Sequence, residues 1–201
     1  MSPRETGLGA SGKFEPLRRD DVVPDINATV GDFWAWALGD PRTNRTRGLF
    51  TEWLIAQVLG LPPENVREDW ADWDLLWDDL HIEVKTTGVL QAWRAGPGGR
   101  SPLGFSGLKG HRFDETSGQI SKTKEFKAHI YVFCAHDHKR GKYDLTDPEQ
   151  WEFWVMTRDE IADLNQTSVR LSRLRDLRGD GCRSFAELRD SLKYARERLN
   201  N

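Results

Sequence analysis

Apolar and polar positions recur with two different periods along the chain, and the change of period predicts where helices and strands lie. Residue spacing and start and stop signals predict helices at 29–38, 49–59, 158–164 and 184–199. Short runs of β-branched and aromatic residues predict strands at 73–77, 80–87, 104–108, 129–135 and 151–157. Because helices and strands interleave, we expect one mixed α/β domain.

The ends of the predicted elements indicate how this domain is bounded. Residues 1–24 are rich in Gly, Ser and charged side chains, so we expect a flexible amino-terminal segment before a domain at 25–201. Thr29 stands where it can cap the first helix. The helix at 49–59 is followed by Gly60 and then by two prolines, which stop a helix.

Composition excludes several classes of protein. The 201 residues are 37% hydrophobic and 30% charged, and no apolar run approaches the ~18 residues of a membrane helix. The amino terminus lacks the apolar stretch of a signal peptide, so we expect a cytoplasmic protein that does not bind a membrane. Two cysteines are too few for a disulfide framework. Cys134, His136 and His138 alternate, but three ligands on one short stretch fit tetrahedral zinc poorly.

The stretch from Asp72 to Gly88 joins an acidic run to a β-branched strand. Positions 68–83 contain seven acids and no Lys or Arg. Pairing the two strands across a two-residue turn at Asp78-Asp79 gives two unlike faces. One face is wholly apolar, and the other presents Asp74, Leu76, His81, Glu83 and Lys85. A shift of one residue would bury the charges, which supports this register.

This register places Asp74 opposite Glu83, where like charges repel each other. A divalent cation such as Mg²⁺ would remove the conflict, because it takes hard oxygen ligands and completes its octahedron with water and substrate phosphate. Lys85 lies on the same face, about 7 Å beyond Glu83 along the strand. The three side chains therefore suit metal-dependent hydrolysis of a phosphodiester. An ordinary charged strand pair is the alternative interpretation.

At these residues the chain resembles the PD-(D/E)XK nuclease superfamily, which includes many restriction endonucleases, junction resolvases and repair nucleases. The resemblance implies that Asp74, Glu83 and the Val84 carbonyl hold Mg²⁺, for which Mn²⁺ can substitute. It also implies that Lys85 orients and activates the attacking water. Trp73 stands where the family motif has proline, which is a departure from the pattern.

The same resemblance sets the expected fold and function. It implies a restriction-endonuclease-like mixed sheet flanked by helices in a single domain, and the matching order of elements covers roughly residues 45–157. It implies a metal-dependent endodeoxyribonuclease of restriction–modification, defence or repair type. The rival expectation is a DNA- or protein-binding module that keeps the nuclease fold without catalysis.

Two further residues are candidates for supporting roles in catalysis. Glu52 interrupts an apolar helical pattern, and the resemblance implies that an acid from this helix approaches the metal; a boundary glutamate paired with an arginine is the alternative. Gln91 continues the strand parity of Glu83 and Lys85, so it could hold a phosphate or a water; a solvent-facing amide is the alternative.

The charge is distributed unevenly along the chain, although the net charge is only −3. Residues 91–127 contain seven Lys and Arg against three acids, a pattern that favours contact with a polyanion such as DNA. Candidate phosphate contacts, in this segment and at the start of the second helix, are Arg45, Arg47, Arg94, Arg100, Lys109 and Arg112. Trp93 and Trp70 could stack on bases, with packing as the alternative for both. Cleavage of both DNA strands favours a homodimer, and specificity could come from a protein partner.

Overall fold

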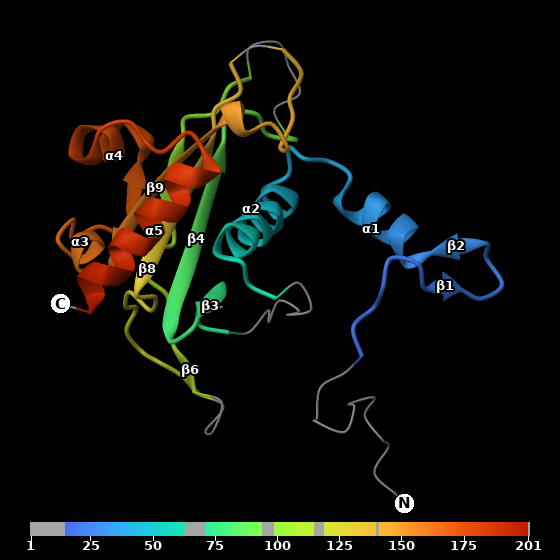
Figure 1. Cartoon of the computed structure of the whole chain (residues 1–201), viewed down its shortest axis with the longest axis horizontal. Coiled ribbons are helices and arrows are strands. Elements are labelled where there is room, and N and C mark those ends of the chain that lie inside the picture. Colours follow the sequence, from blue (N-terminus) through green and yellow to red (C-terminus); the bar gives the residue numbers. More distant parts are fainter. Residues whose placement is uncertain (1–14, 63–70, 94–98, 115–118, 140, 201) are drawn as a thin grey trace, which may run out of the picture. The chain divides into compact units, whose positions relative to one another are not determined.

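The computed structural model describes residues 15–62, 71–93, 99–114, 119–139 and 141–200 (Figure 1). It divides into two units, Met1–Gly39 and Asp40–Asn201. This boundary lies further along the chain than the predicted one between residues 24 and 25, because the residues that follow 24 pair within the first unit. No helix in the described ranges is long and apolar enough to cross a membrane.

The first unit contains a short hairpin and one helix. Strands β1 (Val22–Val23) and β2 (Ala28–Thr29) pair in antiparallel fashion, and helix α1 (Val30–Leu38) follows directly. Thr29 caps this helix as predicted: its hydroxyl accepts the Asp32 N–H, and the Asp32 carboxylate accepts the Thr29 N–H at 2.8 Å. This reciprocal pair satisfies backbone donors that the first helical turn leaves without partners.

The second unit is built on a four-stranded mixed sheet. Its strands are β3 (Leu75–Trp77), β4 (Leu80–Gly88), β8 (Ile130–His136) and β9 (Trp151–Thr157). They lie in the order β3-β4-β8-β9, and only the central pair, β4 with β8, runs parallel. The prediction of a mixed α/β fold is confirmed.

The β3–β4 hairpin has the predicted register. Leu75 lies opposite Ile82, Leu76 opposite His81 and Trp77 opposite Leu80. Asp78 begins the turn with a φ of 54°, a left-handed conformation that Asp adopts more readily than most residues.

Helices α2 (Asn44–Leu59) and α5 (Phe185–Leu199) cover one face of this sheet, and Figure 1 shows α5 beside β8 and β9. The apolar core there joins side chains such as Ile55, Ile82 and Leu192. Helix α2 begins five residues earlier than predicted, because the Thr43 hydroxyl accepts the Thr46 N–H and caps a longer helix. It ends at Gly60, as predicted, with a φ of 71°.

The other face of β8 and β9 carries a second apolar core. Strand β5 (Gly104–Ser106) pairs with β10 (Ser168–Arg170), and helices α3 (Arg158–Ala162) and α4 (Leu171–Arg178) pack beside them. The sequence patterns predicted β5 and α3 but neither β10 nor α4. The remaining elements are β6 (Phe113–Asp114), β7 (Gln119–Ile120) and a short 3₁₀ helix, η1 (Pro148–Gln150).

Candidate active site

The hairpin continues one step beyond β3 and brings Asp74 to the edge of β4. The Asp74 N–H donates to the Ile82 carbonyl at 3.0 Å, and the Asp74 carboxylate accepts the Val84 N–H at 2.7 Å. The carboxylate therefore lies against the backbone between Glu83 and Lys85. Asp74 is held by both its backbone and its side chain, which gives the carboxylate a defined position.

The backbone of Val84 places a carbonyl oxygen at the same edge. In a strand the N–H and C=O groups of one residue point to the same side, and alternate residues point to opposite sides. The Val84 N–H points toward Asp74, so its carbonyl points away from β8 and toward the edge where the Asp74 carboxylate lies. The Val84 side chain is buried in the core shared with α2 and α5.

The Glu83 side chain lies on the face of β4 opposite to that of Val84, and Lys85 lies on the same face as Glu83. Its side chain is 18% exposed, and one carboxylate oxygen lies 2.5 Å from the Lys85 Nζ. Burial raises the pKa of the Glu83 carboxyl above 4.5, and the nearby Asp74 charge raises it further; Lys85 and Lys127 oppose both effects. The ionised form of Glu83 is therefore held at a free-energy cost, and an added positive charge at this position would stabilise it.

Strand β5 and the turn after it approach the Lys85 ammonium. Gly107 adopts a φ of 67°, and a Cβ atom at this position would lie 3.9 Å from the Lys85 Nζ. Glycine at this turn therefore allows the backbone to pass close to the ammonium without a side chain between them. Lys85 is 21% exposed, so it remains reachable from solvent while its amine is held near Glu83.

Charged and aromatic side chains pack beside the hairpin. Lys127 donates to the Asp72 carboxylate at 2.8 Å, and both side chains are largely buried. The Trp73 ring stacks on His81 with ring centroids 3.6 Å apart. Burial, followed by the charge of His129, lowers the pKa of His81. Neither the Lys127–Asp72 pair nor the His81–His129 contact could be predicted from the sequence, because each joins positions about 50 residues apart with no local pattern between them.

The oxygen atoms of Asp74, Glu83 and the Val84 carbonyl are of the chemical type that binds a magnesium ion. Two carboxylates and one backbone carbonyl are hard ligands, and Mg²⁺ sites often use one or two carboxylates and keep several waters. Within the described residues, no group of three or more His, Cys, Asp and Glu side chains could hold a metal ion. The protein side chains available there are therefore the pair Asp74 and Glu83, and further positions would go to the Val84 carbonyl, water and substrate.

Glu52 does not complete a three-acid group with this pair among the described residues. It is half-buried on α2, one position after Thr51, whose hydroxyl hydrogen-bonds the Thr86 hydroxyl of β4. Its predicted catalytic role stays a prediction.

Gln91 lies beyond the end of β4 and is only 9% exposed. Its amide donates to the Gly88 carbonyl at 3.0 Å and accepts from the Arg47 guanidinium at 3.0 Å. The amide is therefore fixed, but by Arg47 and the backbone and not by the acid pair.

The expectation that Arg47 contacts phosphate needs correction. Arg47 is fully buried. Besides Gln91, its guanidinium donates to the Leu90 carbonyl at 3.0 Å, the Tyr143 hydroxyl at 3.1 Å and the Asn44 side chain at 2.7 Å. These neutral acceptors hold a buried cation inside the protein, where it cannot touch DNA. The position of Arg47 at the start of the second helix favoured a phosphate contact, but this local signal carries no information on the distant segments that cover Arg47.

The other predicted phosphate contacts are distributed differently. Arg45 is exposed near the start of α2. Arg100 pairs with Asp137 at 3.0 Å and donates to the His138 carbonyl. Lys109 lies over the Phe126 ring, and Arg112 pairs with Glu125. Arg94 lies outside the described residues, as does Trp70. Exposed ion pairs of this kind are weak, so they leave Arg100 and Arg112 able to exchange a carboxylate for a phosphate.

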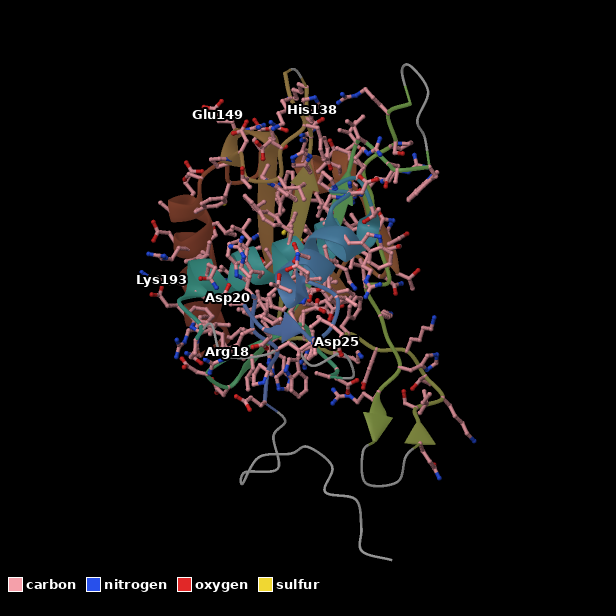
Figure 2. All side chains as sticks on the ribbon, turned by 90° about the vertical axis from the view of Figure 1, so that its right-hand side faces the viewer. Arg18, Asp20, Asp25, His138, Glu149 and Lys193 are labelled. Atoms are coloured by element: carbon pink, nitrogen blue, oxygen red, sulfur yellow. The ribbon has the colours of Figure 1, made fainter. Side chains whose placement is uncertain are left out.

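The alternating residues considered for zinc end up in different surroundings. Cys134 is buried in the core, and burial raises the pKa of its thiol. Burial lowers the pKa of His136 to about 4, and its Nε2 lies 3.1 Å from the Asp144 carbonyl. His138 faces the Gln150 side chain, and Figure 2 shows it near Glu149, at the end of the sheet where β8 leaves and β9 enters.

Comparison of the chain with protein-family models, with curated proteins and with solved structures finds no match.

Proposed function

We propose that the protein is a Mg²⁺-dependent phosphodiesterase that hydrolyses DNA, an endonuclease of restriction, defence or repair type on a restriction-endonuclease-like sheet. The observation that carries this proposal is the pair of carboxylates around Val84, with a lysine ammonium 2.5 Å from one of them. The raised pKa of Glu83 supports it, because the pair is electrostatically unfavourable without a further positive charge.

Each residue has a separate role in the proposed reaction. Asp74, Glu83 and the Val84 carbonyl would hold Mg²⁺ or Mn²⁺. When bound, such an ion lowers the pKa of a water molecule and neutralises charge on a phosphate. Lys85 would leave its ion pair with Glu83, orient the attacking water and donate a hydrogen bond to the scissile phosphate. Asp74 keeps the hydrogen bond from Val84 throughout, which preserves the position of the carboxylate.

The rival function is a binding module without catalysis. The Lys85–Glu83 ion pair favours it, since this contact partly neutralises the site in the absence of any metal. Against it stands the Asp74 carboxylate, which still raises the pKa of Glu83 despite that ion pair. A module with no metal to bind could keep the hydrogen bond from the Val84 N–H with an asparagine at position 74 and avoid the repulsion.

A cleavage assay separates the two functions. Supercoiled, linear duplex, single-stranded and branched DNA are incubated with wild-type protein in Mg²⁺, in Mn²⁺ and in EDTA. We expect cleavage of at least one form with either metal and none in EDTA. The same assay on Asp74→Ala and Lys85→Ala should show no cleavage, with melting curves confirming that both variants are folded. Binding without cleavage of any form would support the rival.

The number of active sites is part of the same proposal. One acid pair cuts one strand, so a double-strand break calls for a homodimer or for a second cut by the same subunit. Sedimentation of the wild-type protein with and without DNA measures whether it is a monomer or a dimer. Specificity would come from surface loops or from a protein partner.

A further inference from the structure

A polar cleft of about 350 Å³ opens beside the candidate active site, and Lys85 lines it. The other described residues at its wall include Asn44, Gln91, Trp93, Ser101 and Ser106. These come from the start of α2, from the chain that follows β4 and from β5 with the loop before it. The cleft thus shares one residue, Lys85, with the proposed catalytic group.

The residues that line the cleft suit a ligand that carries an uncharged polar ring and a neighbouring anionic group. Hydroxyl and amide groups predominate, Lys85 is the positive charge, and no acid is among the described residues that line the cleft. The Gln91 amide is held at both ends, by the Gly88 carbonyl and the Arg47 guanidinium. Asn44 accepts from the same guanidinium at 2.7 Å. Arg47 is therefore a positioning residue that fixes two amides at the cleft wall.

Trp93 adds an aromatic surface at the same place. Its side chain is 66% exposed, although tryptophan side chains are on average largely buried. An exposed tryptophan that borders a polar cleft can stack on a nucleobase, an interaction that does not depend on base identity.

Size narrows the class of ligand. A volume of about 350 Å³ is at the lower end for a ligand site, which suits one nucleotide and not a base pair. Because Lys85 faces both the cleft and Glu83, a nucleotide in the cleft would have its phosphate beside the acid pair.

Building on the proposed function, we propose that this cleft holds one unpaired nucleotide next to the phosphate that is cleaved. Its base stacks on Trp93, and its polar edge faces the amides of Asn44 and Gln91. The substrate class is therefore DNA with an unpaired nucleotide at the cleavage position, such as a single strand, a flap or a junction, in preference to a continuous duplex.

Binding measured without metal tests this inference independently of catalysis. Fluorescence anisotropy in EDTA compares a single strand, a duplex and a duplex with one unpaired 2-aminopurine. The proteins are wild type, Trp93→Ala, Trp93→Phe and Trp53→Ala, a control whose tryptophan is 55% exposed but does not line the cleft. Melting curves check the fold of each variant.

We expect wild type to favour the two DNAs with unpaired bases and to change the 2-aminopurine fluorescence. Trp93→Ala should bind these DNAs about five- to 150-fold more weakly, the range for loss of one base–aromatic stack. Trp93→Phe should recover most of the affinity, and Trp53→Ala should match wild type. Equal affinity of wild type and Trp93→Ala for all three DNAs would overturn the inference.

The outcomes separate this inference from the proposed function. Metal-dependent cleavage by wild type together with unchanged binding by Trp93→Ala would support the nuclease function and contradict nucleotide binding in the cleft. Binding that depends on Trp93, with no cleavage of any DNA, would support nucleotide binding in the cleft and contradict the nuclease function.

Discussion

Two glutamates lie on the same face of the four-stranded sheet, one among positive charges and the other beside a second carboxylate. Glu152 on β9 is 1% exposed; it pairs with Arg175 and with Arg183 at 3.3 Å, and accepts the Gly181 N–H at 3.0 Å. Glu83 on β4 has one lysine as a close partner and a second carboxylate, Asp74, nearby.

The difference separates a carboxylate that stabilises the fold from one that does not. The charge of Glu152 is matched by two guanidinium groups, so its burial is compensated within the chain. The charge of Glu83 is opposed by burial and by Asp74. Such an arrangement costs stability, and costs of this kind cluster at functional sites.

Replacement of each glutamate by glutamine should separate the two most clearly in the cleavage assay. We expect Glu83→Gln to lower the rate of metal-dependent DNA cleavage on the order of 10³-fold, because it removes a positioned charged group from the reacting centre. Glu152→Gln should cleave within about twofold of wild type, measured at a temperature where both variants are folded. Equal rates for both variants would erase the distinction.

Stability should change in the opposite sense. Glu152→Ala leaves two arginines and a backbone N–H without their acceptor, and we expect a loss of about 1–3 kcal/mol in the free energy of unfolding. We expect no larger loss, since Arg175 and Arg183 are 34% and 50% exposed and water can replace the lost partner. In EDTA, Glu83→Gln should gain a few tenths to about 1 kcal/mol by relieving repulsion from Asp74. Urea unfolding curves measure both changes, and a loss in Glu83→Gln as large as that in Glu152→Ala would contradict the comparison.

The smallest expected effect is a pH dependence of that gain. The pKa of Glu83 is raised in the folded protein above its ordinary value of 4.5, so the folded state binds this proton more tightly than the unfolded state. Ionisation of Glu83 therefore lowers stability as the pH rises above 4.5. The stability difference between Glu83→Gln and wild type, measured in EDTA, should vanish well below pH 4.5 and reach its full value above the raised pKa. A difference that stays constant from pH 4 to pH 8 would mean that Glu83 does not carry the penalty.

The hairpin could be predicted from the sequence because its information is local. Side chains that alternate between two faces over adjacent strands determine the register, and a one-residue shift would have buried the charges. The same local patterns predict both ends of α1, β4, β8, β9 and α5 to within one residue.

The rest depends on contacts between distant positions. Arg47 and Tyr143 are 96 residues apart, and Lys127 and Asp72 are 55 apart. No periodicity within one element reports such contacts, so the burial of Arg47 and the second ion pair beside the hairpin were missed. Helix α4 was missed as well, since only two of its eight residues, Leu171 and Leu174, are buried, and three of the others are arginines.

The effect of Mg²⁺ on the melting temperatures of wild type and Asp74→Asn tests the central claim most directly. In EDTA we expect Asp74→Asn to melt slightly higher, because it keeps an oxygen for the Val84 N–H and loses the repulsion from Glu83. In Mg²⁺ the order should reverse, since only wild type gains the binding free energy, about 2.7 kcal/mol at a hundredfold excess over the dissociation constant. If Asp74→Asn melts lower than wild type in EDTA and Mg²⁺ shifts both equally, the two carboxylates do not form a metal site.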